Sequence, residues 1–199
     1  MGGALLFALR PQSHLPNAVI DAVRYRGTRA DGNYQVDALL CEGPLDRQID
    51  EAVGFVLRRQ RVRAQKEPDR AETGEYDGRA VFEAVTNAVV HRDYSIGGST
   101  IRLCLFDDRL ELHVPGHLPN SVTVDTLATR QATRNELIVR FLSRTRVRGA
   151  SQASPRRYME ARGEGVALVL ERSRALSGRE PLYEMQGEEL QLTIFAARD

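Results

Sequence analysis

The stretch from Gly78 to His91 constrains the fold of this chain more than any other. Glu83, Asn87 and His91 are each four residues apart, so on a helix they would lie above one another on one face. Apolar residues at the intervening positions would form the packing face. The stretch therefore predicts an amphipathic helix that places a carboxylate, an amide and an imidazole side by side. Its apolar members are Val81, Ala84, Val85, Ala88 and Val89.

This set of side chains suits chemistry on a metal-bound polyphosphate. The Asn87 amide oxygen could complete the shell of Mg²⁺, which prefers hard oxygen ligands, and the Glu83 carboxylate could orient a water molecule. Two simpler interpretations stay open. The three side chains could form an ordinary solvated helix face, and His91 could be a structural histidine.

Periodicity elsewhere predicts a mixed α+β chain. Residues 109–114 alternate apolar and polar, and the turn at Asp107-Asp108 joins them to the apolar run 100–106, which indicates a hairpin. Pro44 suits the start of a helix over 44–57. Further strands are expected over 4–9, 18–26, 34–41, 182–186 and 190–197, and further helices over 122–127, 135–142 and 158–176, the last interrupted near 163–165.

Composition excludes several classes of protein. Charged residues make up 28% of the 199 residues and the net charge is only +1, which argues against disorder and against a strongly basic polyanion-binding protein. Cys41 and Cys104 have no metal-binding spacing. No apolar run approaches the roughly 18 residues of a membrane span, and the start lacks signal-peptide features. We therefore expect a cytoplasmic protein with no membrane partner.

Five segments in order resemble one family, the bacterial and archaeal transcriptional regulators that are sometimes labelled as ATP-dependent-helicase-related. These proteins join an AlbA-like (Schlafen-type) domain to a divergent histidine-kinase-type ATPase domain. The segment 83–95 is the most specific of the five. The resemblance extends from about Ala4 to Ala197 and rests on residues 83–95, 106–112, 115–119, 134–135 and 162–165.

The resemblance implies the two-layer sandwich of the GHKL (Bergerat-type) ATPases, a mixed sheet covered by helices on one face, preceded by a small β-α segment. It also implies ATP and Mg²⁺ as cofactors. Glu83 would then be the general base of a weak Mg²⁺-dependent ATPase, and Asn87 the Mg²⁺ ligand. Residues expected to contact nucleotide are Asn87, His91, Gly116, Arg162, Gly163 and Gly165.

The sequence departs from this superfamily at the adenine contact. The expected Asp-x-Gly-x-Gly is replaced by residues 113–117, His-Val-Pro-Gly-His, which contain no Asp, and His117 stands where relatives commonly have Gly. The residue that would hold the adenine amine in that superfamily is therefore missing here. A Gly-x-Gly such as Gly163 to Gly165 is weak evidence by itself, since a turn would explain it equally well.

The resemblance also predicts the domain organisation. Residues 1–65 match the region that connects to an AlbA-like domain, residues 66–78 a linker, and residues 79–199 the divergent ATPase domain. The AlbA-like DNA-binding domain of the family would precede Met1, so DNA binding through that domain is not expected of this chain.

Three functions stay open at this point. The first is the nucleotide-binding module of a transcriptional regulator, with weak or no ATPase activity. The second is a degenerate ATPase fold that no longer binds nucleotide and serves as a scaffold for homodimers or other protein interactions. The third is nucleic-acid binding through the Arg-rich stretch 140–157, for which a solvated loop is the simpler interpretation.

Overall fold

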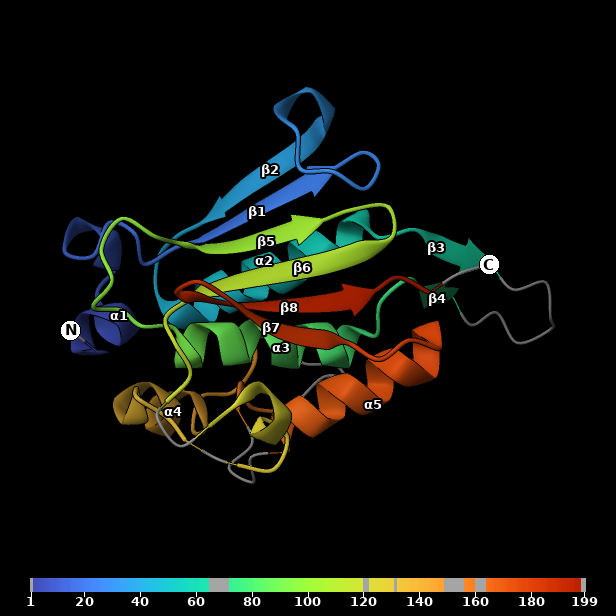
Figure 1. The fold of residues 1–199 in the computed structure, drawn as a ribbon. Helices are drawn as coiled ribbons and strands as arrows, with labels where there is room; N and C mark the ends of the chain where they lie inside the picture. Colours follow the sequence, from blue (N-terminus) through green and yellow to red (C-terminus); the bar gives the residue numbers. More distant parts are fainter. Residues whose placement is uncertain are drawn as a thin grey trace.

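A six-stranded mixed sheet forms the centre of the molecule (Figure 1), with the strand order β2-β1-β5-β6-β8-β7. The computed structural model describes residues 2–64, 72–119, 122–130, 132–148, 156–159 and 164–197. Strands β1 and β5 pair in parallel and the other neighbours pair antiparallel. The strands of this sheet are β1 (Ile20–Tyr25), β2 (Gln35–Cys41), β5 (Ile101–Leu105), β6 (Arg109–Pro115), β7 (Leu182–Gln186) and β8 (Glu189–Phe195).

Helices cover one face of the sheet, and Figure 1 shows α3 below β6 and β8 with α5 beneath it. Strand β6 explains why this face is the buried one: Leu110, Leu112 and Val114 point to the helices, while Glu111 and His113 lie on the other face. The predicted hairpin of β5 and β6 is confirmed. The helices are α1 (Gly2–Phe7), α2 (Leu45–Arg59), α3 (Gly78–His91), α4 (Glu136–Leu142) and α5 (Gly165–Ser177).

Three expectations about local structure are wrong. The run 4–9 is not a strand but belongs to α1, where Phe7 meets Phe141 of α4 edge-on with ring centroids 5.0 Å apart. The expected helix over 122–127 is only a short 3-10 turn, Val124–Thr126. Of the expected helix over 158–176, residues 158–159 are not helical, residues 160–163 lie outside the described part of the chain, and α5 begins at Gly165. Within the expected linker, Glu72–Gly74 forms β4, which pairs with β3 (Val62–Ala64) in a two-stranded ribbon.

The N-terminal segment shares the sheet and the core with the rest of the chain. Strand β1 pairs with β5, and α2 packs against α3. Residues on both sides of 66–78 contribute to one hydrophobic core. The division of the chain into two parts at this position stays a prediction. Within the described residues no helix is both long and apolar enough to cross a bilayer.

Candidate functional site

Helix α3 carries the predicted polar residues and begins with a defined cap. The Asp77 carboxylate accepts a hydrogen bond from the backbone N–H of Ala80 at 2.9 Å, which satisfies one of the free donors at the helix start. Val81, Val85 and Val89 are fully buried and hold the helix against the sheet. The predicted helix is therefore confirmed, with its apolar face fixed in the core.

The end of α3 is held by a buried arginine. The Arg92 guanidinium donates hydrogen bonds to the carbonyls of Asn17 and Ser99, at 2.5 and 2.6 Å, and lies over the ring of Tyr94. Burial lowers the pKa of Arg92. These contacts join the helix end to the segments before β1 and β5, and so fix the position of His91 one residue earlier.

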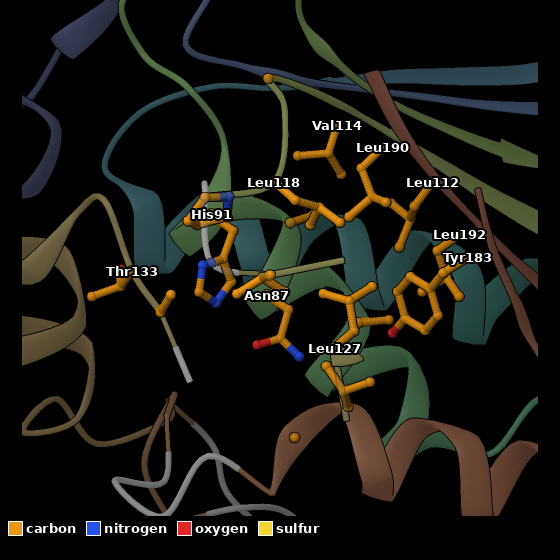
Figure 2. A pocket seen from close by; sticks show the side chains of 18 of the residues that line it. Asn87, His91, Leu112, Val114, Leu118, Leu127, Thr133, Tyr183, Leu190 and Leu192 are labelled. Atoms are coloured by element: carbon orange, nitrogen blue, oxygen red, sulfur yellow. The ribbon is translucent and has the colours of Figure 1, made fainter. Parts of the chain in front are cut away.

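A cavity of about 270 Å³ lies beside α3, and Glu83, Asn87 and His91 all line it. Figure 2 shows Asn87 and His91 directed into this space, with the apolar side chains of β6 and β8 on the sheet side. The cavity is slightly smaller than the roughly 300–1,000 Å³ of typical ligand sites. Most of its lining is apolar, which suits a ring system, and includes Leu112, Val114, Leu118, Val122, Leu127, Val139, Met159, Leu190 and Leu192.

The first residue of α5 lies against the polar face of α3. A Cβ added at Gly165 would overlap the Glu83 carboxylate and come within 3.1 Å of Asn87 Nδ2. Glu83 is only 6% exposed. Only glycine therefore allows α5 to begin at this distance from the carboxylate and the amide.

The start of α5 has the features of an anion-binding helix end. Its N-cap residue, Glu164, makes no side-chain capping hydrogen bond, and the first turn holds no acidic residue. The unpaired N–H groups and the dipole of a helix start favour negative charge. Beside this helix start, Asn87 Nδ2 is buried and makes no hydrogen bond to any described residue. A buried donor without an acceptor is costly, so it marks a place where a ligand oxygen would be stabilised.

Two other titratable groups on the cavity wall are held neutral. Burial lowers the pKa of His91, and the positive charge of Arg134 lowers it further. Burial raises the pKa of Tyr183, and the negative charge of Glu83 raises it further. At neutral pH the imidazole and the phenol can therefore donate or accept hydrogen bonds without carrying charge.

The loop after β6 is clamped to the end of α3. Gly116 has a φ of +117°, and a Cβ there would lie 2.6 Å from the Asp93 Cβ. The backbone N–H of Asp93 donates to the carbonyl of Pro115 at 2.8 Å, and Arg134 pairs with the Asp93 carboxylate at 2.7 Å and donates to the carbonyl of His117. Gly116 thus has a structural reason to be glycine besides its place on the cavity wall.

Sequence reasoning located part of this site. The structure brings Glu83, Asn87, His91, Gly116 and Gly165 to one cavity. Arg162 and Gly163 lie outside the described residues. The roles assigned to these side chains stay predictions.

Sequence reasoning missed Thr133 and Tyr183, which also line the cavity. The alternation of residues 182–186 could have placed Tyr183 on the core face of its strand. No local signal connects either residue with α3. Within the described residues no group of three or more His, Cys, Asp or Glu side chains could hold a metal ion.

Comparisons with known proteins agree with this architecture. Residues 98–194 match the family model described as "Putative ATP-dependent DNA helicase recG C-terminal". The matched segment includes the cavity-lining strands β6, β7 and β8, and begins after α3. No curated protein matches the chain.

A solved structure, that of the DIP2311 protein from Corynebacterium diphtheriae, is similar over 99% of this chain, with a TM-score of 0.76 and 20% sequence identity. This chain spans 37% of that protein's chain. The predicted fold class, an ATPase-like two-layer α+β sandwich, is thus confirmed. The family match makes residues 98–194 similar to the C-terminal part of putative ATP-dependent DNA helicases.

Proposed function

We propose that the chain is a nucleotide-binding module that takes ATP with Mg²⁺, acts within a transcriptional regulator, and has weak or no ATPase activity. One observation carries the proposal: Glu83 and Asn87, one helical turn apart, line the same cavity and lie against the start of α5. A carboxylate, an amide and a helix N-terminus are groups that suit a metal-bound phosphate chain.

The residues present fit Mg²⁺ and phosphate. Mg²⁺ is usually held by one or two protein oxygens, with waters and substrate phosphates completing the shell, so a dense cluster of acidic ligands is not needed. The Asn87 amide oxygen can supply one such ligand. Its Nδ2, which has no hydrogen-bond partner in the described part of the chain, can then donate to a phosphate oxygen. When bound, Mg²⁺ neutralises charge on the phosphates.

Different sides of the cavity would contact different parts of the nucleotide. The start of α5 would hold phosphate through its backbone N–H groups, next to Asn87. Glu83 would orient a water molecule, an effect typically worth roughly 10²–10⁴ in rate. The neutral His91 would bind without adding charge. The apolar side chains of β6 and β8 would contact the base.

Weak binding follows from the base end of the site. Residues 113–117 contain no carboxylate, so they offer no acceptor for an exocyclic amine of the base. A base held only by apolar contacts gains burial but little discrimination between purines. We therefore expect ATP and ADP to bind with modest affinity.

Isothermal titration calorimetry with ATP, ADP and a non-hydrolysable ATP analogue, each with and without Mg²⁺, tests the proposal. Asn87→Ala should lower the Mg²⁺-dependent affinity for nucleotide. Asn33→Ala, at an exposed position outside the cavity lining, is the matched control and should leave that affinity unchanged. Glu83→Gln should abolish hydrolysis and keep binding. Absence of binding heat for all three nucleotides would refute the proposal.

A degenerate ATPase fold that serves as an interaction scaffold is the second candidate. The contact between Gly165 and the Glu83 carboxylate favours it, because in this arrangement α5 occupies space next to the proposed base. The missing aspartate in residues 113–117 points the same way. Under this candidate, sedimentation equilibrium should show self-association that nucleotide does not change.

A further inference from the structure

Positive charge is concentrated in one short part of the chain. Residues 137–159 contain six arginines and no Asp or Glu, so this segment carries a formal charge of +6. Since the whole chain has a net charge of +1, the remainder has 1 − 6 = −5. Such asymmetry within one chain is typical of a surface that meets a polyanion. The six arginines, here named the basic surface, are Arg140, Arg144, Arg146, Arg148, Arg156 and Arg157.

The fold brings the two ends of the segment together on the outside of the molecule. All six side chains of the basic surface are exposed. Arg140 lies in the last turn of α4. Arg146 and Arg157 face each other in an antiparallel β-bridge, and the backbone N–H of Val147 donates to the carbonyl of Arg156 at 3.2 Å. The bridge thus places Arg146 beside Arg157, 11 positions further along the chain (157 − 146).

Most of this charge has no counter-charge among the residues that the structure describes. Arg148 pairs with the Asp46 carboxylate at 3.0 Å, and Arg157 donates to the carbonyl of Ser143 at 3.1 Å. Among the described residues, the guanidinium groups of the other four arginines have no hydrogen-bond or ion-pair partner. Like charges directly opposite each other in a bridge are destabilising, so the pair of Arg146 and Arg157 costs free energy. An anionic partner would offset that cost.

The surrounding side chains narrow the choice of partner. Single-stranded nucleic acids are bound largely by stacking on aromatic rings. The two aromatic residues of this region are engaged elsewhere: Phe141 packs edge-on against Phe7, while the buried Tyr158 stacks on Phe82 and donates a hydrogen bond to Asp50 at 2.6 Å. The basic surface therefore offers guanidinium groups without a stacking platform.

A lipid surface fits less well. Membrane-surface helices place an apolar face in the bilayer next to their basic face. In α4 the apolar residues Ile138 and Leu142 are buried in the protein core, and Val139 lines the cavity, so this face is already used. What remains exposed next to the arginines is Leu137 alone among the apolar residues of α4.

We propose that the basic surface binds the phosphate backbone of a nucleic-acid duplex without reading its sequence. Guanidinium groups match phosphate geometry, and contacts to phosphate position a protein on a duplex without carrying sequence information. This interaction is separate from nucleotide binding, because none of the six arginines lines the cavity. It does not depend on whether the cavity holds a nucleotide.

Fluorescence anisotropy with a labelled DNA duplex of random sequence, titrated at several salt concentrations, tests the proposal on the full chain. With about four phosphate contacts, affinity should fall roughly 100-fold between about 50 and 200 mM salt. In the triple variant Arg140→Gln, Arg144→Gln, Arg156→Gln, binding should weaken strongly. Its salt slope should decrease by about 1 for each arginine removed.

Two controls separate this effect from general charge and from misfolding. The variant Arg58→Gln, Arg174→Gln removes exposed arginines of α2 and α5 and should bind like the unaltered chain. The triple Lys variant at positions 140, 144 and 156 keeps the charge and should retain most of the binding. If the Gln triple variant fails to fold, the binding of the Lys variant and the salt slope of the unaltered chain still test whether the basic surface binds phosphate.

Parallel titrations with an RNA duplex and with vesicles of anionic lipid identify the source of the phosphate. Binding to either duplex with the expected salt slope and loss in the Gln variant supports the proposal. No anisotropy change at low salt would overturn it. So would equal losses in the control variant, or binding to vesicles but to neither duplex.

Discussion

The contact between α5 and the polar face of α3 can be tested by adding one methyl group. Gly165→Ala would place a Cβ where the Glu83 carboxylate now lies, and within 3.1 Å of Asn87 Nδ2. Glu83 is buried, so its carboxylate can move only by entering the mainly apolar cavity or by pushing α5 away. Both movements cost free energy, and we expect the variant to be destabilised.

The magnitude follows from two opposing contributions. Adding atoms to a well-packed site costs about 1–3 kcal/mol. Replacing glycine by alanine inside a helix stabilises it by up to about 1 kcal/mol, but Gly165 is only the first helical residue, so little of that gain applies. The net loss in the free energy of unfolding should be about 1–3 kcal/mol, which corresponds to a fall in Tm on the order of 2–10 °C for a chain of this size.

Gly54→Ala in α2 is the matched control with the opposite sign. Its Cβ would lie 2.6 Å from Arg58 Nη1, but Arg58 is exposed and its guanidinium can turn into solvent. Here the helix gain of about 0.5–1 kcal/mol should dominate. Urea unfolding of both variants and of the unaltered chain measures the difference. If Gly165→Ala proves as stable as Gly54→Ala, α5 does not begin against Glu83, and the arrangement of the site is wrong.

Other parts of the site lead to two further predictions. Gly116→Ala should lower the free energy of unfolding by about 2–4 kcal/mol, because it combines an unfavourable φ with a clash against Asp93; unchanged urea unfolding would contradict this. Hydrogen bonds from Ser95 lower the pKa of Asp93, and Arg134 lowers it further. Because its folded pKa lies below the unfolded value of about 3.9, the carboxylate stabilises the fold above that pH and the contribution is lost as pH falls through the folded pKa. Thermal unfolding should thus show Asp93→Asn less stable than the unaltered chain at neutral pH, with the gap closing in acid; a gap independent of pH would refute this.

Local patterns in the sequence were sufficient for most of the regular elements. Helix α3 and strand β6 have one apolar face at the period of their structure, and both were predicted correctly because burial of that face decides their conformation. The prediction of a strand over 4–9 was wrong. A short apolar run fits a strand or a helix equally well. In the structure this run belongs to helix α1, and Phe7 packs against Phe141.

The candidate site, too, could be predicted only in part from the sequence. The sequence by itself determined that Glu83, Asn87 and His91 share one helix face, since four-residue spacing fixes this within a single element. Only the tertiary structure decided what stands opposite them: Gly165 comes from 82 positions beyond Glu83 (165 − 83). Tyr183 and the apolar residues of β8 come from still further along the chain. Periodicity reports which side of an element is buried, but the partners on that side depend on how the sheet and helices pack, and no local spacing encodes that.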